Sequence, residues 1–376
     1  MEVETIPLRC ELNEPFGFAQ GWYESRENLI VKITTAEGIE GFGECFGPIK
    51  LNKEAVESLL TPLLLGERVF QTKRLWRKMY RSLRASFQTF VPLTALSGVD
   101  VALWDAKAKL MDRPLGDLLG GRVRDRVSAY ATGHYFKRTD SLQQLLELIV
   151  EEAKKNVKEG FSSIKLKLGL EKIGFSVEDD LKLVNAVREE LGEDTGIMVD
   201  ANYAYSRLEA ERVGRALENC DIKWFEEPIS PDDFEGMRQL RGALSIPVAA
   251  GECLGPEGEF LRLFEEEAVD IVQPDICTAG GITVMENVLR VAEAKGIKLI
   301  PHVWGTPVAT AANLQIMSTF ESPPLLELDR SQHPIRTELR EELLTIDGSQ
   351  VWVPSRPGLG LGLKEELLRD INEKYE

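Results

Sequence analysis

Carboxylate side chains close a series of short apolar runs in the middle of the chain. Asp200, Glu226 and Glu252 each follow such a run, about 25 residues apart, which is the length of one strand–helix unit. The C-terminal ends of parallel barrel strands face one site, so these acids are predicted to converge. Three carboxylates that meet cannot all stay ionised without a cation, and Mg²⁺ prefers such oxygen ligands. A single strand-end acid is more often a helix N-cap, but three in series favour a metal site.

Two lysines stand two residues apart in an apolar run that precedes this series. Lys165 and Lys167 share one face of the strand predicted at 163–169, and the other face carries Ile164 and Leu166. A Lys-x-Lys pair is commonly a solvated edge. Here the apolar face must pack on helices, which turns the lysines into the barrel. A lysine buried beside another cation loses basicity and can act as a general base near neutral pH.

A histidine and two further acids end other runs of the series. Asp275 is expected to hold the His302 imidazole in one tautomer and to raise its basicity. Lys167 and His302 would then stand on opposite sides of a substrate carbon, where one removes a proton and the other returns one. Glu327, at the end of the last run, is expected to donate a hydrogen bond to the developing negative charge. His134, at the end of the first barrel strand, is interpreted as either a structural residue or a substrate contact.

An aromatic segment with glycines lies between the first two predicted strands. Residues 16–23 contain four aromatic side chains, including Trp22 and Tyr23, and two glycines without a clear periodicity. The segment is either an ordinary surface loop or, beside a barrel, a lid over the active site. We expect the lid, with Trp22 and Tyr23 in contact with the substrate.

The elements that position these residues form three segments. Residues 1–125 alternate as strands and then turn helical, which predicts an α+β domain that carries the lid loop. Residues 126–329 repeat strand and helix and are predicted to form the catalytic barrel. Residues 330–376 hold too few apolar side chains for a core of their own and are expected to pack back on the first domain.

Composition limits the partners and the compartment. The formal net charge of −17 argues against nucleic acid and anionic membranes as partners, but it allows a small anionic substrate where cations gather locally. No apolar run reaches the roughly 20 residues that cross a bilayer. The acidic start of the chain does not resemble a signal peptide. The five cysteines show no CxxC pairing, so reduced thiols and a cytoplasmic location are expected.

The motifs together resemble the enolase superfamily, and in particular its mandelate racemase subgroup. They are Lys165-x-Lys167, Asp200–Ala201–Asn202, Glu226–Glu227–Pro228, Gly251–Glu252, Gln273–Pro274–Asp275, Gly280–Gly281, His302 and Glu327. The resemblance implies a modified TIM barrel, (β/α)7β, with an α+β capping domain, one Mg²⁺ per subunit and a homo-oligomer. It also implies removal of the proton next to a carboxylate to give an enediolate, a pattern known for this superfamily.

The resemblance assigns a role to each matching position. Asp200, Glu226 and Glu252 would be the metal ligands, and Asn202 would contact the substrate. Lys167 would be one base and His302, paired with Asp275, the other. Lys165 would be the cation beside the substrate carboxylate. Glu327 would be the electrophilic acid.

Several functions stay open at this point. Segments 129–133, 302–306 and 329–336 resemble members of the subgroup that act on an acid sugar or its lactone by β-elimination, as cycloisomerase or dehydratase. One alternative is a racemase or epimerase of a 2-hydroxy acid. Muconate-lactonizing and dipeptide-epimerase relatives are disfavoured because Asp275 has no lysine nearby. A metal-dependent hydrolase is disfavoured because the first strand lacks His-x-His. A non-catalytic barrel kept for binding is the alternative from another class, although the expected catalytic residues are all present.

Overall fold

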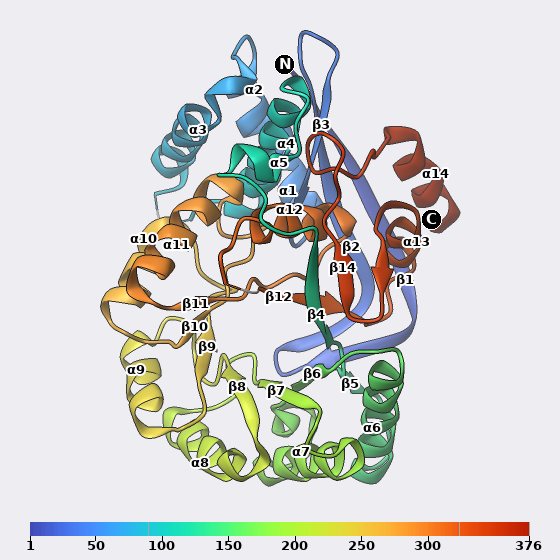
Figure 1. Cartoon of the computed structure of the whole chain (residues 1–376), viewed down its shortest axis with the longest axis vertical. Helices are drawn as coiled ribbons and strands as arrows, with labels where there is room; N and C mark the ends of the chain where they lie inside the picture. The colour runs from blue at the N-terminus through green and yellow to red at the C-terminus, as the bar shows by residue number, and fades with distance from the viewer. Residues whose placement is uncertain (89, 323, 376) are drawn as a thin grey trace.

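A ring of parallel strands, each followed by a helix, forms the centre of the computed structural model, which describes residues 1–88, 90–322 and 324–375 (Figure 1). The strands are β4 (Arg126–Thr132), β6 (Ser163–Lys167), β7 (Gly196–Asp200), β8 (Ile222–Glu226), β9 (Val248–Ala250), β10 (Ile271–Val272), β11 (Lys298–Leu299) and β12 (Leu325–Asp329). The connecting helices are α6 (Leu142–Lys158), α7 (Val177–Leu191), α8 (Arg207–Leu217), α9 (Phe234–Ala243), α10 (Glu257–Glu265), α11 (Gly281–Lys295) and α12 (Pro307–Met317). This alternation is the predicted (β/α)7β barrel.

The strands pair in chain order around the ring. β4 pairs with β6 on one side and with β12 on the other, and parallel pairing continues from β6 to β11. Within the described residues, no ladder joins β11 to β12. Buried side chains fill the interior of the ring, and they are Tyr130, Met198, Trp224, Ala249, Ile271 and Ile300. The interior of the barrel is therefore a packed core, and the predicted site residues lie at the C-terminal ends of its strands.

Local sequence signals begin the barrel helices. Ser206 and Glu209 form a reciprocal capping box at α8, because each side chain accepts from the backbone N–H of the other residue. Helix α6 also begins at a residue whose side chain caps it. Its N-cap is Ser141, whose hydroxyl accepts from the N–H of Gln144.

The capping domain is a small antiparallel sheet with helices packed against it. Its strands are β1 (Glu2–Phe18), β2 (Gly21–Thr34), β3 (Glu40–Cys45) and β5 (Phe136–Lys137). Its helices are α1 (Ile49–Glu54), a π-helical turn (Ala55–Leu60), α2 (Thr61–Leu64), a 3₁₀ turn (Val69–Gln71), α3 (Thr72–Phe87), α4 (Leu93–Leu110) and α5 (Leu115–Leu118). Helix α4 packs so closely on β3 that a Cβ at Gly43 would lie 2.0 Å from the carbonyl oxygen of Gly98.

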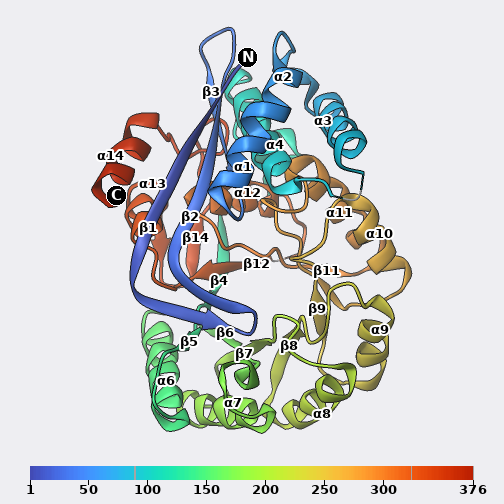
Figure 2. The same cartoon turned by 180° about the vertical axis from the view of Figure 1, so that it is seen from behind.

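The segment at 16–23 is the tip of a hairpin, not the expected loop. Strand pairing continues to Phe18 and Gly21, so only two residues form the turn. The aromatic side chains explain this difference, because Phe16 and Tyr23 face each other across the two strands with ring centroids 5.5 Å apart. The long hairpin brings its tip down to the barrel strands β6 and β7 (Figure 2). Its position matches the expected lid, but its conformation is regular.

The C-terminal segment contacts both domains. It contains α13 (Pro334–Leu343), β13 (Ile346–Asp347), β14 (Gln350–Trp352) and α14 (Glu365–Tyr375). Helix α14 packs against β1 of the capping domain, as expected. Strand β14 instead pairs antiparallel with barrel strand β4.

A buried ion-pair cluster joins the three segments. Asp329 at the end of β12 binds Arg336 of α13 and lies 3.6 Å from Arg26 of β2. Burial would raise the pKa of Asp329, but the guanidinium groups of Arg336 and Arg26 outweigh it and hold that pKa below its usual range.

Two further observations bear on the expectations from composition. All five cysteines are free thiols. In the described part of the chain, no helix combines the length and the apolar character that a membrane crossing requires.

Asp329→Asn is expected to lower the free energy of unfolding by about 3 kcal/mol at pH 7, because it leaves two buried arginines without their acid. The pKa of Asp329 is depressed in the folded state, so its contribution is full above the unfolded value and is lost as the pH falls. Urea denaturation at pH 7 and at pH 3 measures this, and the difference from wild type should shrink at pH 3. Asp347→Asn, at an exposed acid of β13, is the control. Equal stability of Asp329→Asn and wild type at pH 7 would contradict the assignment.

Candidate active site

Three neighbouring strands bring the predicted metal ligands together. Asp200 ends β7, Glu226 ends β8 and Glu252 lies two residues after β9. One carboxylate oxygen from each lies within 4.8 Å of the other two. Trp224 Nε1 and Gln273 Nε2 donate to Glu226 Oε2, at 2.9 and 2.7 Å, and fix that side chain. The prediction that these three acids converge is confirmed.

The two lysines of β6 point into this acidic cluster. Lys165 binds Glu226 and lies 2.8 Å from Glu327, and Lys167 Nζ lies 2.5 Å from Asp200 Oδ2. Burial would lower the pKa of both lysines, but these carboxylates outweigh it and raise both pKa values above the ordinary one. The expected loss of lysine basicity is therefore not found among these acids, and it would need a cation that offsets their charge. The acids around each lysine have more influence than the neighbouring lysine.

The cluster carries more negative than positive groups, which fits a bound cation. Burial, together with Asp200 and Glu226, raises the pKa of Glu252 to about 7. Burial and the same neighbours also raise the pKa of Glu227 well above its usual range. Glu252 Oε2 is buried and lacks a hydrogen-bond partner. A hard divalent cation among Asp200, Glu226 and Glu252 would meet this need for positive charge.

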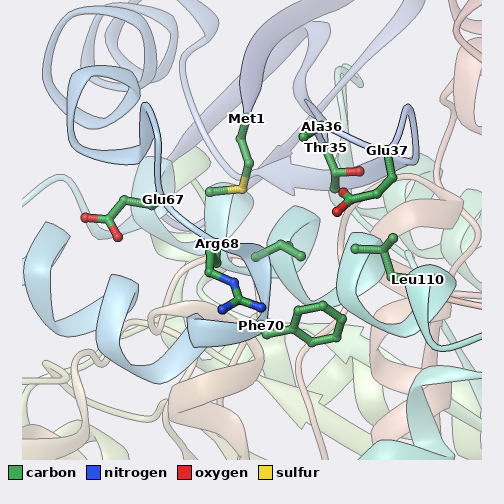
Figure 3. Close-up of a pocket in the computed structure, with 9 residues that line it drawn as sticks. Met1, Thr35, Ala36, Glu37, Glu67, Arg68, Phe70 and Leu110 are labelled. Carbon is green, nitrogen blue, oxygen red and sulfur yellow. The ribbon is translucent and has the colours of Figure 1, made fainter.

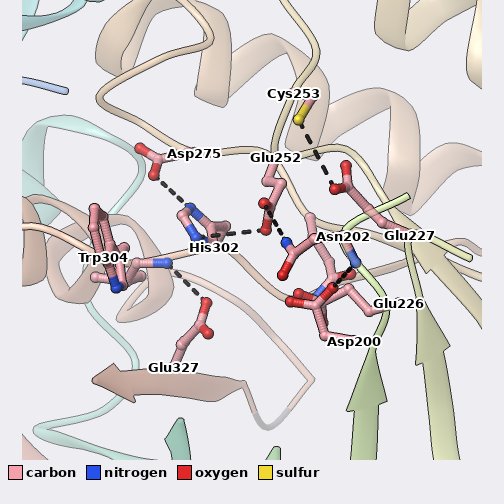
Figure 4. A network of polar contacts seen from close by, with 12 residues as sticks. Asp200, Asn202, Glu226, Glu227, Glu252, Cys253, Asp275, His302, Trp304 and Glu327 are labelled. Atoms are coloured by element: carbon pink, nitrogen blue, oxygen red, sulfur yellow. Dashed lines mark hydrogen bonds and ion pairs between the residues drawn. The ribbon is translucent and has the colours of Figure 1, made fainter. Parts of the chain in front are cut away.

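His302 and Asp275 form the predicted pair (Figure 4). They follow β11 and β10, and an isolated bridge joins their backbones. His302 Nδ1 lies 2.6 Å from Asp275 Oδ2, which leaves Nε2 near Glu252, 3.5 Å from Oε2. Burial lowers the pKa of His302, but Glu252, Glu327 and Asp275 together raise it to about 10. The arrangement holds a proton on the imidazole beside the metal ligands.

Glu327 is a carboxylate that accepts hydrogen bonds in this structure. It lies within β12, and it accepts from the N–H of Val303 at 3.1 Å as well as binding Lys165. Burial would raise its pKa, but Lys165 and His302 outweigh it and lower the pKa. As an electrophilic acid Glu327 would need a proton, so that role requires a substrate that changes its surroundings.

A cavity of about 50 Å³ lies between the two bases and under the hairpin tip. Its lining consists of Phe18, Tyr23, Phe46, Tyr135, Lys167, Asn202, Glu252, His302 and Trp304. Asn202 links its two sides, because Oδ1 accepts from Lys167 Nζ at 3.0 Å and Nδ2 donates to Glu252 Oε1 at 3.3 Å. Gln20 at the hairpin tip donates to the Asn202 carbonyl at 2.7 Å and holds the tip over the cavity.

Two residues expected to contact substrate lie outside this cavity. His134 is fully buried, with Nδ1 2.9 Å from the Lys165 carbonyl oxygen and Nε2 3.1 Å from Asn156. Both ring nitrogens are thus occupied by the protein. Trp22 packs over Gly17 on the opposite face of the hairpin from Tyr23. Neither residue belongs to the substrate site that we propose.

Four cavity residues were not among the predicted site residues. Phe18 and Phe46 come from the capping domain, Tyr135 follows β4, and Trp304 lies two residues after His302. Its position at the end of a strand made His134 a predicted substrate contact. In the structure the backbone has positive φ at Gly133 and His134, and Tyr135 lines the cavity instead. Phe46 directly follows β3, so the strand-end criterion would have found it had it been applied to the capping domain.

A second hollow, of about 110 Å³, lies in the capping domain (Figure 3). Met1, Phe70 and Leu110 line it together with Arg68, Glu37 and Glu67. None of the predicted catalytic or metal-binding residues lines it, so it is not the candidate active site.

The barrel, the capping domain and this set of acids and bases define a class of enzymes. Residues 148–367 match the model of the enolase C-terminal domain-like family. Residues 1–120 match the model of the mandelate racemase / muconate lactonizing enzyme N-terminal domain. The chain belongs to the enolase superfamily, in its mandelate racemase subgroup.

Several relatives within this class are named for reactions of acid sugars or their lactones. The chain is 37% identical to D-galactarolactone cycloisomerase of Agrobacterium fabrum, over 98% of this chain and 97% of that protein. The crystal structure of 3,6-anhydro-D-galactonate cycloisomerase from Zobellia galactanivorans has 36% identity and a TM-score of 0.87, with 100% and 98% of the two chains covered. A mutant L-talarate/galactarate dehydratase, liganded with Mg and L-glucarate, has 30% identity and a TM-score of 0.81, with 98% and 90% covered.

Glu226→Gln is expected to weaken divalent metal binding more than about 100-fold, because it removes one of three carboxylate ligands. Electron paramagnetic resonance of free Mn²⁺, used as a probe ion, measures the dissociation constant. Asp180→Asn serves as the control, since Asp180 is a fully buried acid outside the cluster. Unchanged Mn²⁺ affinity in folded Glu226→Gln would show that the ion binds elsewhere.

Proposed function

We propose that this protein removes the proton next to a carboxylate of an acid sugar or its lactone and then expels the β-oxygen. The observation that carries the proposal is one cavity that both Lys167 and His302 line, beside the acids Asp200, Glu226 and Glu252. The cycloisomerase and dehydratase relatives support the substrate class.

The acids and lysines of the barrel would bind the reacting carboxylate. Asp200, Glu226 and Glu252 would hold one Mg²⁺, which when bound supplies positive charge for the substrate carboxylate. Lys165 is fully buried beside Glu226 and Glu327 and adds a second positive charge at the same place. An α-proton is too weakly acidic for a side chain to remove unaided, so charge placed in advance lowers the barrier to the enediolate.

Lys167 and His302 would move the protons. Asn202 accepts a hydrogen bond from Lys167 Nζ, and Asp275 binds His302 at Nδ1. Each base is thus oriented by one neighbouring side chain. One residue takes the α-proton in its neutral form. The other, in its protonated form, donates to the departing β-oxygen or returns a proton to the carbon. Loss of the oxygen gives an enol that tautomerises to a 2-oxo product.

Racemisation or epimerisation of a 2-hydroxy acid is the second candidate. It uses the same two bases and differs only in returning the proton to the opposite face without loss of the oxygen. Opposed bases in one cavity are the observation that favours it. Deuterium at C2 with retention of every hydroxyl would distinguish it from elimination.

The test combines a screen with two variants. With Mg²⁺ present, D-galactarolactone, galactarate, L-talarate and L-glucarate are incubated in D₂O, and loss of the C2 proton signal and formation of 2-oxo product are followed by NMR. Lys167→Ala and His302→Asn should differ: with one C2 configuration, one variant loses exchange by about 100-fold or more and the other keeps it. With the opposite configuration the two variants should exchange roles.

Two outcomes would contradict the proposal. Wild-type exchange and turnover in both variants would place the chemistry on other residues. Full turnover after exhaustive chelation would exclude the divalent metal. Circular dichroism of both variants confirms that any loss is not loss of fold.

Tyr23→Ala is expected to raise KM about fivefold or more, because the Tyr23 ring lines the cavity and lies 4.8 Å from Trp304. Trp22→Ala should mainly lower Tm, because Trp22 packs on Gly17 away from the cavity. Steady-state kinetics and thermal unfolding measure both. A larger KM effect from Trp22→Ala than from Tyr23→Ala would mean that the hairpin presents its other face to the substrate.

A further inference from the structure

A buried acid of the capping domain lies against the barrel loop that carries His302. Glu44 of β3 is 1% exposed, and its carboxylate accepts from the N–H of Thr306 at 3.0 Å and from the Thr306 hydroxyl at 2.7 Å. It also accepts from the N–H of Ala309 at 3.1 Å. These groups lie at the N-terminus of α12, where free N–H groups and the helix dipole favour a negative charge.

The contact between Glu44 and this loop is close. Gly305 precedes the helix, and a Cβ there would lie 2.6 Å from Glu44 Oε1. The Thr306 hydroxyl donates to Glu44 and accepts from the N–H of Val308, so one side chain serves both the helix cap and the domain contact. The loop could not move relative to Glu44 without breaking several buried hydrogen bonds.

The rest of loop 302–306 is also held by neighbouring elements. Val303 donates to Glu327, and the Trp304 carbonyl accepts from Arg26 of β2 at 3.4 Å. The Arg26 guanidinium lies 3.7 Å from the centroid of the Trp304 ring. Glu44 and Arg26 of the capping domain thus help to fix this loop, together with Glu327 and Asp275 of the barrel.

The network extends to the C-terminal segment. The side-chain amide of Asn28 on β2 donates through Nδ2 to Glu44 Oε1 at 2.7 Å, and its Oδ1 lies 2.8 Å from His333 Nε2. All three residues are buried. One chain of hydrogen bonds thus connects His333, Asn28, Glu44 and Thr306, which belong to three segments of the molecule.

The opposite base is held differently. Gly169 and Leu170, which follow Lys167, donate their N–H groups to Asp180 of α7 at 2.9 and 3.1 Å. The hydroxyl of Tyr205 donates to the same carboxylate at 2.7 Å. All of these residues belong to the barrel, so the support behind Lys167 does not involve Glu44.

We propose that Glu44 is the positioning residue for the His302 side of the reaction. Through Thr306 it sets the position of loop 302–306, and with it the His302 imidazole and the Trp304 wall. Its effect is specific to one face of the substrate, because Asp180 supports the Lys167 face independently. This inference rests on the proposed role of His302 as a base.

The experiment compares proton exchange on the two faces. The Glu44 carboxylate accepts hydrogen bonds from N–H and O–H groups, and Glu44→Gln would place an amide N–H donor against one of them. Proton exchange on the His302 face should therefore slow about tenfold or more. Exchange on the Lys167 face should change less than about threefold. Galactarate and L-talarate, which differ in configuration at one α-carbon, report the two faces in D₂O with Mg²⁺. His302→Asn and Lys167→Ala assign the faces, and Asp180→Asn should spare the His302 face.

A milder pair of variants guards against misfolding. Thr306→Val removes the hydroxyl that donates to Glu44 and should reproduce the face-specific loss, whereas Thr306→Ser should restore wild-type exchange. Equal loss on both faces, or no loss, in folded Glu44→Gln and Thr306→Val would overturn the inference. If His302→Asn and Lys167→Ala themselves leave exchange unchanged, the proposed function fails instead.

A measurement without substrate tests the contact itself. Hydrogen–deuterium exchange with mass spectrometry should show about tenfold faster exchange of the peptide that contains Thr306 and Ala309 in Glu44→Gln, because both amides donate to Glu44. The peptide that contains Gly169 and Leu170 should be unchanged. Equal protection of the first peptide in variant and wild type would show that Glu44 does not hold the loop.

Discussion

The structure depends on keeping several like charges together in a buried place. Asp200, Glu226, Glu252 and Glu327 meet at the mouth of the barrel, and the positive groups beside them are Lys165, Lys167 and His302. Burial and the repulsion between neighbouring carboxylates disfavour the ionised form of these acids, and the pKa of Glu252 is raised for this reason. The backbone of parallel strands holds the acids in place regardless, since strand pairing fixes each strand end. The barrel thus provides the rigidity that a charged site of this kind requires.

The same kind of interaction, a buried carboxylate at a helix N-terminus, aligns the two domains. Glu44 meets the start of α12, and Asp100 of α4 accepts from the N–H and the hydroxyl of Thr283 near the start of α11, both at 2.8 Å. These helices follow β11 and β10, whose ends lead to His302 and Asp275. A shift of the capping domain would therefore move the helices behind the histidine–aspartate pair. The position of the hairpin tip and the geometry of one base are coupled through this contact.

The sequence predicted the parts of the site that follow from strand periodicity. The convergence of Asp200, Glu226 and Glu252 and the pairing of His302 with Asp275 need only the order of strands in a parallel barrel. Periodicity could not predict a local change of backbone direction, and positive φ at His134 turned that side chain inward. The sequence predicted a loop at the hairpin tip. Cross-strand aromatic pairing depends on strand register, which the sequence of a single strand does not reveal. The two-residue spacing of the lysines could not predict their pKa, because it depends on every neighbour, including acids from distant strands.

The division of the cavity wall separates chemistry from substrate selection. Lys167, Asn202, Glu252 and His302 come from the barrel, as do the aromatic residues Tyr135 and Trp304, whereas Phe18, Tyr23 and Phe46 come from the capping domain. In the proposed reaction the barrel residues would surround the reacting carbon and its carboxylate, an arrangement that suits any substrate with an acidic α-proton. The aromatic side chains would then face the rest of the substrate, so their size and polarity would select among the acid sugars or lactones of the proposed function. Because Gln20 ties the hairpin tip to Asn202, the wall that selects the substrate is attached to a residue that touches both Lys167 and Glu252. A substitution in the hairpin that changes substrate preference would therefore also affect the position of the base Lys167.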